Sequence, residues 1–407
     1  MPDRIADTLV LVFTYGMSLR GWQSSGLLAR EWALYDALLP RYERLVLATY
    51  GGPDDAAALD AVIRPEHRPK VAVVCRAPGI SVEAHAADLP ARVAASVGDA
   101  RTVVVKTNQM VGGEVAVGIT QTLRAGGRRV ALVARGGYLW TRFAAHDHGP
   151  DSPAATDAAA REGALCAAAD LVVGTTPDMV EDLAWRYLLP PERVTVIPNY
   201  VLIDRPVRPA SERTPGLLLY AGQLSPRKRV DLLIRAVAML DAATRSAVTL
   251  EIIGEGPERK ALGALAASLA APVRFLPRLP HHDVIERMSA CAVYAQASEL
   301  EGHPKTVLEA MAAGTPVVVA DAPGLGDVVT HGGTGLRLPP DPAAFAHALQ
   351  ELLRDEDWRE QLGGAASRAI RTSFGLPTVI ALECAAHRRA ADHGWPRAQS
   401  VPAARVA

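Results

Sequence analysis

Short apolar runs rich in β-branched residues alternate along this chain with longer stretches of helical periodicity. Runs of this length are expected of strands that are covered on both faces of a parallel sheet. The alternation therefore predicts an α/β fold with doubly wound parallel sheets. The expected strands are 8–14, 44–50, 71–74, 102–107, 129–135, 170–175, 194–201, 216–222, 248–254, 273–277, 291–297 and 317–320. The expected helices are 27–39, 89–97, 113–124, 155–168, 231–240, 283–289, 341–353, 356–371 and 376–392.

The pattern divides the chain into two domains. At 407 residues the chain is long enough for each domain to bury its own core. Residues 203–215 carry three prolines and several charges, so we expect an interdomain linker there. The first domain then covers 1–202 and the second covers 216–375, with a last helix over 376–394. Residues 395–407 are rich in Ala, Pro and Arg and are predicted to be disordered.

Composition narrows the class of protein. The hydrophobic fraction of 49% and charged fraction of 21% are ordinary for a soluble α/β protein, and the net charge of -1 gives no reason to expect nucleic acid as a partner. We see no membrane-spanning run and no signal peptide, so we predict a cytoplasmic protein. Only five of the 43 basic residues are lysines, a usage that suggests a GC-rich, bacterial genome. The cysteines have neither metal spacing nor a disulfide pattern: Cys75, Cys166, Cys291 and Cys384.

Residues 298–321 contain two glutamates that need an explanation. Pro304 suits the first turn of a short helix, and an apolar strand follows that helix. Glu301 precedes the helix and Glu309 lies within it. Either glutamate alone would be interpreted as a solvated surface residue. Glu309, however, is flanked by apolar residues in a helix that is otherwise nearly all small or apolar, which argues against that interpretation.

The start of this helix is a candidate anion site. The N–H groups of Lys305 and Thr306 would point out of the first turn. Glu309 would lie about 7 Å further along the axis, at roughly 1.5 Å per residue from Pro304. That is about the reach from a diphosphate to the ribose of a nucleotide. Glu309 could then accept hydrogen bonds from both ribose hydroxyls, with Glu301 beside whatever the diphosphate carries.

A basic loop after the strand 216–222 is a second candidate anion site. Arg227, Lys228 and Arg229 lie between the end of that strand and the next helix, where basic side chains favour an anion. A solvated basic turn is the weaker interpretation.

In the first domain, the loops after the strands are candidates for contact with a polar ligand, because ligands of such sheets bind beyond the carboxyl ends of the strands. The richest in polar side chains are 108–110 and 135–138. The glycine-rich stretch 15–26 lacks G-x-G-x-x-G, so dinucleotide binding is a poor interpretation. His146 and His148 have no third ligand nearby, so we expect an exposed loop and no metal.

The stretch 298–321 resembles the glutamate-x7-glutamate motif of retaining glycosyltransferases of family 4. The resemblance includes Ser298, the core 308–311 and the run 314–317. It covers most of the chain and is strongest from about 194 to 372. It implies the GT-B fold, in which two doubly wound Rossmann-like domains face a central cleft and the last helix crosses back to the first domain.

The resemblance implies a retaining, metal-independent glycosyltransferase of the hexosyltransferase type. Its donor would be a nucleotide diphosphate sugar, UDP- or GDP-linked, and no cofactor is expected. Its acceptor would be a small molecule, a glycan or a lipid-linked hydroxyl, which leaves peripheral membrane contact open. The catalytic residues implied are Glu301 and Lys228. The donor-binding residues implied are Glu309, Gln223, Arg227, Gly302, His303, Pro304, Lys305, Thr306, Gly254 and Arg278. The acceptor-side residues implied are Ser25, Gly26, Asn108, Arg135 and Gly136.

The sequence departs from the family pattern at three places. Gln223 stands where the family usually has an arginine, so Arg227 or Arg229 would have to supply that charge. Arg135 follows a strand after which many members carry a histidine. The family has a pair of glycines in the loop after the first strand, and of that pair only Gly26 is matched here. A loop that needs a glycine only for its backbone angles would explain Gly26 equally well.

Two alternatives remain open at this point. A nucleotide-sugar 2-epimerase would share the fold and the donor site, but its set of acid/base residues is not evident. A non-catalytic sugar-nucleotide binding subunit is the other alternative, and Gln223 and the absent histidine motivate it.

Overall fold

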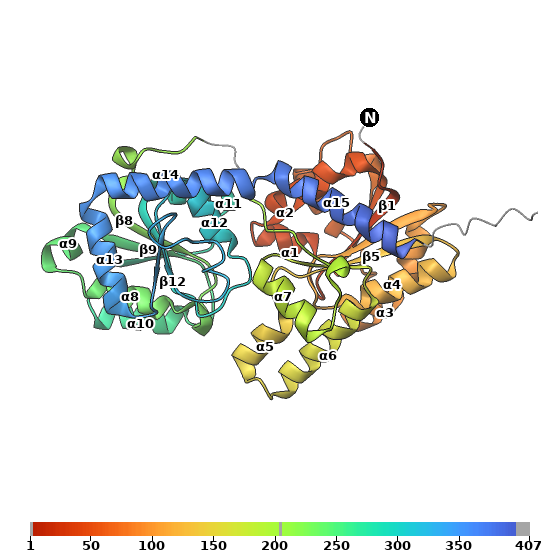
Figure 1. Ribbon diagram of the computed structural model, residues 1–407, viewed down its shortest axis with the longest axis horizontal. Helices are drawn as coiled ribbons and strands as arrows, with labels where there is room; N and C mark the ends of the chain where they lie inside the picture. The colour runs from red at the N-terminus through yellow and green to blue at the C-terminus, as the bar shows by residue number, and fades with distance from the viewer. Residues whose placement is uncertain (1–2, 203–205, 396–407) are drawn as a thin grey trace, which may run out of the picture. The chain divides into compact units, whose positions relative to one another are not determined.

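The computed structural model describes residues 3–202 and 206–395, which form two compact units (Figure 1). One unit contains the chain up to Ser24, Leu28–Ile197 and the residues from Ile380 on. The other contains Ser25–Leu27 and Pro198–Val379. Each unit is built around one parallel sheet, so the prediction of two doubly wound α/β domains is confirmed. The predicted tail, except for Trp395, lies outside the described residues.

The sheet of the first unit has the strand order β3-β2-β1-β4-β5-β6-β7. Its central strands are buried almost completely, as their unbroken Val, Leu and Ala sequences require. The strands are β1 Ala6–Val12, β2 Tyr42–Ala48, β3 Val71–Val74, β4 Thr102–Thr107, β5 Arg129–Arg135, β6 Leu171–Gly174 and β7 Val194–Val196.

Helices cover both faces of this sheet. In Figure 1, α3, α4 and α6 run along one face, and they contact one another in that order. The helices are α1 Leu19–Ser24, α2 Leu28–Leu38, α3 Val82–Val97, α4 Gly113–Ala125, α5 Trp140–His148, α6 Pro153–Ala168, α7 Pro177–Arg186 and the greater part of α15 Leu376–Gly394.

The second unit has the strand order β10-β9-β8-β11-β12-β13. Helices α11, α12 and α14 lie on one side of this sheet, and α8, α10 and α13 on the other (Figure 1). The strands are β8 Thr214–Ala221, β9 Thr249–Ile253, β10 Val273–Leu276, β11 Cys291–Gln296, β12 Val317–Ala320 and β13 Leu336–Leu338. The helices are α8 Val230–Ala238, α9 Ala242–Ala247, α10 Arg259–Ser268, α11 His281–Ala290, α12 Lys305–Ala312, α13 Pro342–Arg354 and α14 Glu356–Ser373.

In both sheets the chain reverses its direction of winding between two central strands. The reversal lies between β1 and β4 in the first unit and between β8 and β11 in the second. The carboxyl ends of strands at such a switch point open a crevice in which ligands of α/β proteins bind. The loops after β8 and β11 are the two that carry Lys228 and Glu301.

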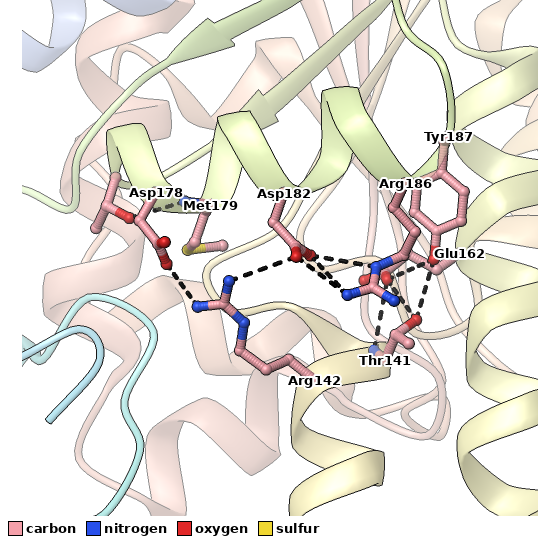
Figure 2. A network of polar contacts seen from close by, with 9 residues as sticks. Thr141, Arg142, Glu162, Asp178, Met179, Asp182, Arg186 and Tyr187 are labelled. Atoms are coloured by element: carbon pink, nitrogen blue, oxygen red, sulfur yellow. Dashed lines mark hydrogen bonds and ion pairs between the residues drawn. The ribbon is translucent and has the colours of Figure 1, made fainter. Parts of the chain in front are cut away.

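Helix α5 corrects the expectation of an exposed loop around His146 and His148. Both histidines lie in the last turn of α5. Leu139 precedes the helix and offers no side-chain cap; instead, Glu162 of α6 accepts hydrogen bonds from the Trp140 and Thr141 amides at 2.8 and 3.4 Å. Figure 2 shows this carboxylate also bonded to the hydroxyls of Thr141 and Tyr187. The helix is capped by a distant residue, which local sequence does not reveal.

Helix α1 differs from expectation for the same reason. We expected a loop over 15–26, but Leu19–Ser24 is helical. The buried carboxylate of Asp55 accepts the Leu19 and Arg20 amides at 3.1 and 2.7 Å and thereby caps the helix.

The segment expected to be a linker is partly incorporated into the second unit. Residues 203–205 lie outside the described residues. Arg213 is 5% exposed and donates hydrogen bonds to the carbonyl oxygens of Ser289 and Ala313. Strand β8 already begins at Thr214. The second unit accordingly includes the described residues of this segment, as part of Pro198–Val379.

A buried ionic cluster joins α15 to the sheet of the first unit. Lys106 of β4 donates to Glu383 of α15 at 2.6 Å, and the two side chains are 0% and 1% exposed. Nε2 of His387 lies 3.2 Å from the same carboxylate, and Nδ1 of His387 bonds to the Tyr42 hydroxyl at 2.7 Å. Burial raises the pKa of Glu383, but Lys106, His387 and Arg135 outweigh it, so the net pKa is far below its ordinary value.

Candidate functional site

The carboxylate of Glu301 lies at the centre of a cluster of donors in the second unit. Its Oε1 is 2.5 Å from Nζ of Lys228, and its Oε2 is 3.7 Å from Nη1 of Arg227. The side chains of Lys228 and Glu301 are 15% and 9% exposed, so the pair is shielded but reachable. The structure thus brings together the two residues for which a catalytic role is expected. Those roles themselves remain predictions.

Gln296, the last residue of β11, is a third donor to Glu301. Its Nε2 lies 2.7 Å from Glu301 Oε1. Its Oε1 accepts from the hydroxyls of Tyr294 and Thr306 at 3.1 and 3.2 Å. A carboxylate can only accept and these hydroxyls donate, so the amide has one orientation. Gln296 therefore connects Glu301 with the first turn of α12.

The two loops that carry these residues are joined along their backbones. The Glu299 amide donates to the Arg227 carbonyl at 2.9 Å, and the Arg227 guanidinium donates to the Leu300 carbonyl. Arg229 instead bonds to Glu299 at 2.9 Å and to Asp231 at 3.1 Å. Of the two arginines considered as replacements for the charge missing at residue 223, Arg227 is therefore the one beside Glu301.

Gln223 is exposed near the start of the same loop. Its carbonyl accepts from the Tyr220 hydroxyl at 2.9 Å. The loop therefore holds the backbone of Gln223 and leaves its neutral side chain toward solvent.

Two glycines permit close backbone contacts that shape the site. Gly324 has φ of +81°, and a Cβ there would lie 2.4 Å from the Glu301 carbonyl oxygen. Gly254 has φ of +145°, and a Cβ would lie 1.9 Å from the Gly222 carbonyl oxygen. Any other residue would push the Glu301 loop or the loop after β8 out of place.

Helix α12 begins at Lys305, with Pro304 as the residue before its first turn. Pro304 was expected within that turn, a difference of one position. The orienting hydrogen bond between Thr306 and Gln296 lies at this helix start. Glu309 follows one turn further on, 5% exposed, with its Oε1 2.8 Å from Nε2 of His281.

The remaining expected donor contacts lie around this helix start. Gly302 is buried in the loop beside Glu301. His303 is also buried: its Nδ1 accepts from the Asn199 amide at 3.0 Å, its carbonyl accepts from the Asn199 side chain at 2.9 Å, and its ring packs on Phe374. His303 thus holds the loop to Asn199, near the start of the second unit's main segment. Arg278 is exposed after β10.

The residues expected on the acceptor side lie at the carboxyl ends of strands in the first unit, apart from Ser25 and Gly26, which group with the second. Asn108 follows β4, and its side chain lies 3.4 Å from the Thr14 hydroxyl. Nε of Arg135 lies 3.9 Å from Glu383. The Gly136 amide donates to the Val173 carbonyl at 3.0 Å. Arg135 therefore extends toward the buried cluster, and no finding tests its role in binding.

Three contacts of the site were not anticipated from sequence. Gln296 was counted as part of an apolar strand, and His281 as a residue before a helix expected at 283–289. Gly324 was counted as part of a turn. A polar residue at the carboxyl end of a buried strand is a signal that could have identified Gln296. Nothing local distinguishes His281 from its neighbour His282.

Within residues 3–202 and 206–395, no group of three or more His, Cys, Asp or Glu residues is arranged to hold a metal ion. Among the same residues, none of the helices combines the length and the apolar character needed to cross a bilayer.

Comparison with known proteins agrees with this geometry. The family model of glycosyl transferases group 1 matches residues 205–369, which include the residues around Glu301 and Glu309 described above except Asn199 and Phe374. The D-inositol 3-phosphate glycosyltransferase of Frankia alni is 35% identical over 230 residues, covering 51% of this chain and 56% of that protein. The Streptomyces coelicolor protein of the same name is 30% identical over 266 residues, covering 57% and 58%. The chain thus spans a little more than half the length of these bacterial relatives.

Solved structures resemble the chain over nearly its full length. Anabaena HepE, in complex with UDP and glucose, has a TM-score of 0.72 at 20% identity and covers 93% of this chain and 98% of its own. Sucrose-phosphate synthase from Thermosynechococcus elongatus has a TM-score of 0.73 at 20% identity and covers 94% and 98%. The chain has the GT-B fold, and its residues 205–369 match the glycosyl transferases group 1 family.

Proposed function

We propose that this protein transfers a sugar from a nucleoside diphosphate sugar, UDP- or GDP-linked, to an acceptor hydroxyl, with retention at the anomeric carbon. The observation that carries the proposal is the placement of Glu301 between Lys228, Arg227 and the start of α12 at the switch point of the second sheet. The UDP and UDP-glucose complexes of HepE support a nucleotide-sugar donor, and the name of the Frankia alni relative supports glycosyl transfer.

The first requirement of the reaction is to stabilise the negative charge on the departing diphosphate. As the glycosidic bond breaks, negative charge grows on the leaving oxygen. Lys228, Arg227 and the first-turn amides of α12 would stabilise that charge in a shielded site. These groups supply the positive charge that a divalent ion supplies in other transferases, so we propose that turnover needs no added metal.

Glu301 would act on the sugar. Its carboxylate would accept hydrogen bonds from sugar hydroxyls and favour positive charge at the anomeric carbon. Because Lys228, Arg227 and Gln296 surround it, the carboxylate is a weak nucleophile. This favours front-face attack by the acceptor over a double displacement through Glu301.

Glu309 would bind the ribose. It lies four residues beyond Lys305, which is about 6 Å along the helix axis. Its carboxylate would accept from the ribose hydroxyls while the diphosphate occupies the helix start.

The alternatives are less well supported. The family match is to glycosyl transferases, so an epimerase is not favoured. The non-catalytic subunit was motivated by the neutral Gln223, but Arg227 stands beside Glu301 and supplies a second positive charge.

The test is a thermal-shift panel of nucleotide sugars, followed by a transfer assay with the radiolabelled donor that stabilises the protein. Binding should raise the melting temperature by mass action. We expect transfer or slow hydrolysis that persists in excess EDTA, and a product with the anomeric configuration of the donor by NMR. Interconversion of donors would indicate an epimerase, and binding without turnover a non-catalytic subunit. Activity restored only by magnesium or manganese would contradict metal independence.

A further inference from the structure

His281 is the first residue of α11 and lies directly after the loop that follows β10. Its Nε2 is 2.8 Å from Oε1 of Glu309 on the neighbouring helix. The His281 side chain is 21% exposed and that of Glu309 is 4% exposed. Both line one small cavity, together with Val201, Ile285 and Arg371. The histidine thus reaches from the edge of the unit to a nearly buried carboxylate.

The hydrogen bond between His281 and Glu309 would lower the entropic cost of binding a ligand at Glu309. A glutamate has three side-chain torsions, and fixing them when a ligand binds has an entropic cost. The hydrogen bond to His281 fixes the carboxylate before any ligand arrives. A carboxylate has about four acceptor positions, and the imidazole occupies one of them on Oε1.

Among the described residues, the charged groups near His281 come from three helices. Glu309 faces it from α12, and Arg371 of α14 lines the same cavity. On α11 itself, Glu286 pairs with Arg208 at 2.8 Å, and His282 pairs with Asp283 at 2.7 Å. Glu309 is therefore the group to which the structure couples His281 directly.

We propose that His281 is a positioning residue that holds Glu309 ready for the ribose of the donor, and that it thereby sets the preference for ribose over 2′-deoxyribose. The inference rests on the proposed donor binding. The new element is a role for a residue outside the two-glutamate motif. The role predicts that His281 and Glu309 together distinguish ribose from 2′-deoxyribose.

The experiment measures dissociation constants of the full-length protein for UDP and 2′-deoxy-UDP, and for GDP and 2′-deoxy-GDP, by calorimetry. The wild type should bind the ribose form of its nucleotide at least tenfold more tightly. His281→Ala should weaken binding of the ribose form about three- to tenfold and that of the deoxy form, which keeps only one hydroxyl for Glu309, by less. His281→Gln, whose side-chain amide still donates, should recover part of the preference.

The chain offers a matched control in the next residue. His282 is 72% exposed, so His282→Ala should leave the ribose preference as in the wild type. Glu309→Gln should reduce the preference at least as much as His281→Ala. A general loosening of the fold would weaken both nucleotide forms equally and would not change their ratio.

The outcomes separate this inference from the function on which it rests. If the wild type binds neither UDP nor GDP at millimolar concentration, the donor proposal fails, and this inference with it. If the wild type prefers ribose and His281→Ala keeps the same ratio, the donor proposal stands and the role of His281 is overturned. Should His281→Ala not fold, the ratio measured for His281→Gln against His282→Ala decides.

Discussion

Two lysine–glutamate pairs, one in each unit, look almost alike as contacts. Lys106 and Glu383 in the first unit are 2.6 Å apart, and Lys228 and Glu301 in the second are 2.5 Å apart. Their surroundings differ. The first pair is 0% and 1% exposed, whereas the second is 15% and 9% exposed.

The position of each lysine relative to its strand explains the difference. Lys106 lies within β4, between Leu11 and Val133 of the adjacent strands, and 5.6 Å from the Tyr35 ring. Lys228 lies in the loop beyond β8, where ligands of parallel sheets bind. A pair that is fully buried is out of reach of a ligand, while a pair at a strand end can exchange one partner for another. The same two residue types therefore serve structure in one unit and, we propose, chemistry in the other.

The largest expected effect is the fall in stability when the buried pair is broken. Lys106→Ala leaves the Glu383 carboxylate buried with its closest positive partner removed, which should cost about 3–5 kcal/mol of unfolding free energy. Urea denaturation of the purified protein measures this. The exposed lysine substitution Lys70→Ala is the control and should change stability by less than about 0.5 kcal/mol. Similar losses for the two variants would show that the cluster does not stabilise the first unit.

Breaking the second pair should affect turnover rather than stability. Lys228→Ala removes a charge that stabilises the leaving diphosphate, and turnover should fall by about 10²–10³-fold with an unchanged urea midpoint. Gln223→Ala should have a much smaller effect because the glutamine is neutral and exposed. If both variants lose turnover equally, Gln223 is a specific donor contact. A large loss of stability in Lys228→Ala would remove the distinction between the two pairs.

Gln296 is a further test of the second pair, because it gives Glu301 a donor that is uncharged and buried. Gln296→Leu keeps the volume and removes the hydrogen bond to Glu301, so kcat should fall about 10- to 100-fold, as for one bond to a charged group of about 1.5–3 kcal/mol. Ser298→Ala removes a weaker partner of the same glutamine and serves as the control. A kcat unchanged in Gln296→Leu would mean that Lys228 and Arg227 alone orient Glu301.

The smallest expected effect is a pH dependence of stability that arises mainly in the buried cluster. Burial lowers the pKa of His387, so the folded chain keeps it neutral while the unfolded chain binds a proton near pH 6.5. The unfolded state then holds more protons, and stability should fall as pH drops below about 6.5, by at most about 1.4 kcal/mol per pH unit. The depressed pKa of Glu383 should add a further loss below about pH 4.3.

His387→Gln tests this pH dependence. Its side chain cannot be protonated, so the loss of stability between pH 6.5 and 5 should become shallower in urea titrations. Burial also lowers the pKa of His85, so some slope should remain in both proteins. An unchanged slope in the variant would show that His387 is not the group that titrates.

The sequence predicted the two parallel sheets, for a physical reason. Every strand except β13, whose LRL run was not among the expected strands, is a short apolar run that can be recognised locally. Lys228 and Glu301 each lie in a loop that follows such a strand, and the structure brings them together, while their roles stay predictions. What sequence did not predict depends on partners distant in the chain. Helices α1 and α5 exist because Asp55 and Glu162 cap them from 35 and 22 residues away. The hydrogen bond of His281 to Glu309 spans 28 residues.

Lys106 is a related case in which a signal was available. A lysine in the run TVVVKT sits among residues that are all buried, and a buried ammonium group needs an anionic partner. The sequence could have predicted that such a partner exists. It could not have predicted that the partner is Glu383, 277 positions later.

The path of α15 has a practical consequence for dividing this protein into fragments. The helix begins among residues that group with the second unit, and from Ile380 onward it belongs to the first. A fragment ending at Ile197 would therefore be made without Glu383 and His387, and Lys106 would be left in an apolar strand with neither of them. The fragment Pro198–Val379 does not separate Lys228 from Glu301 in this way. We expect the segment with the donor site to be obtainable alone, whereas the amino-terminal fragment would require a peptide of residues 380–395 in trans, as in a split protein that assembles only when both parts are present.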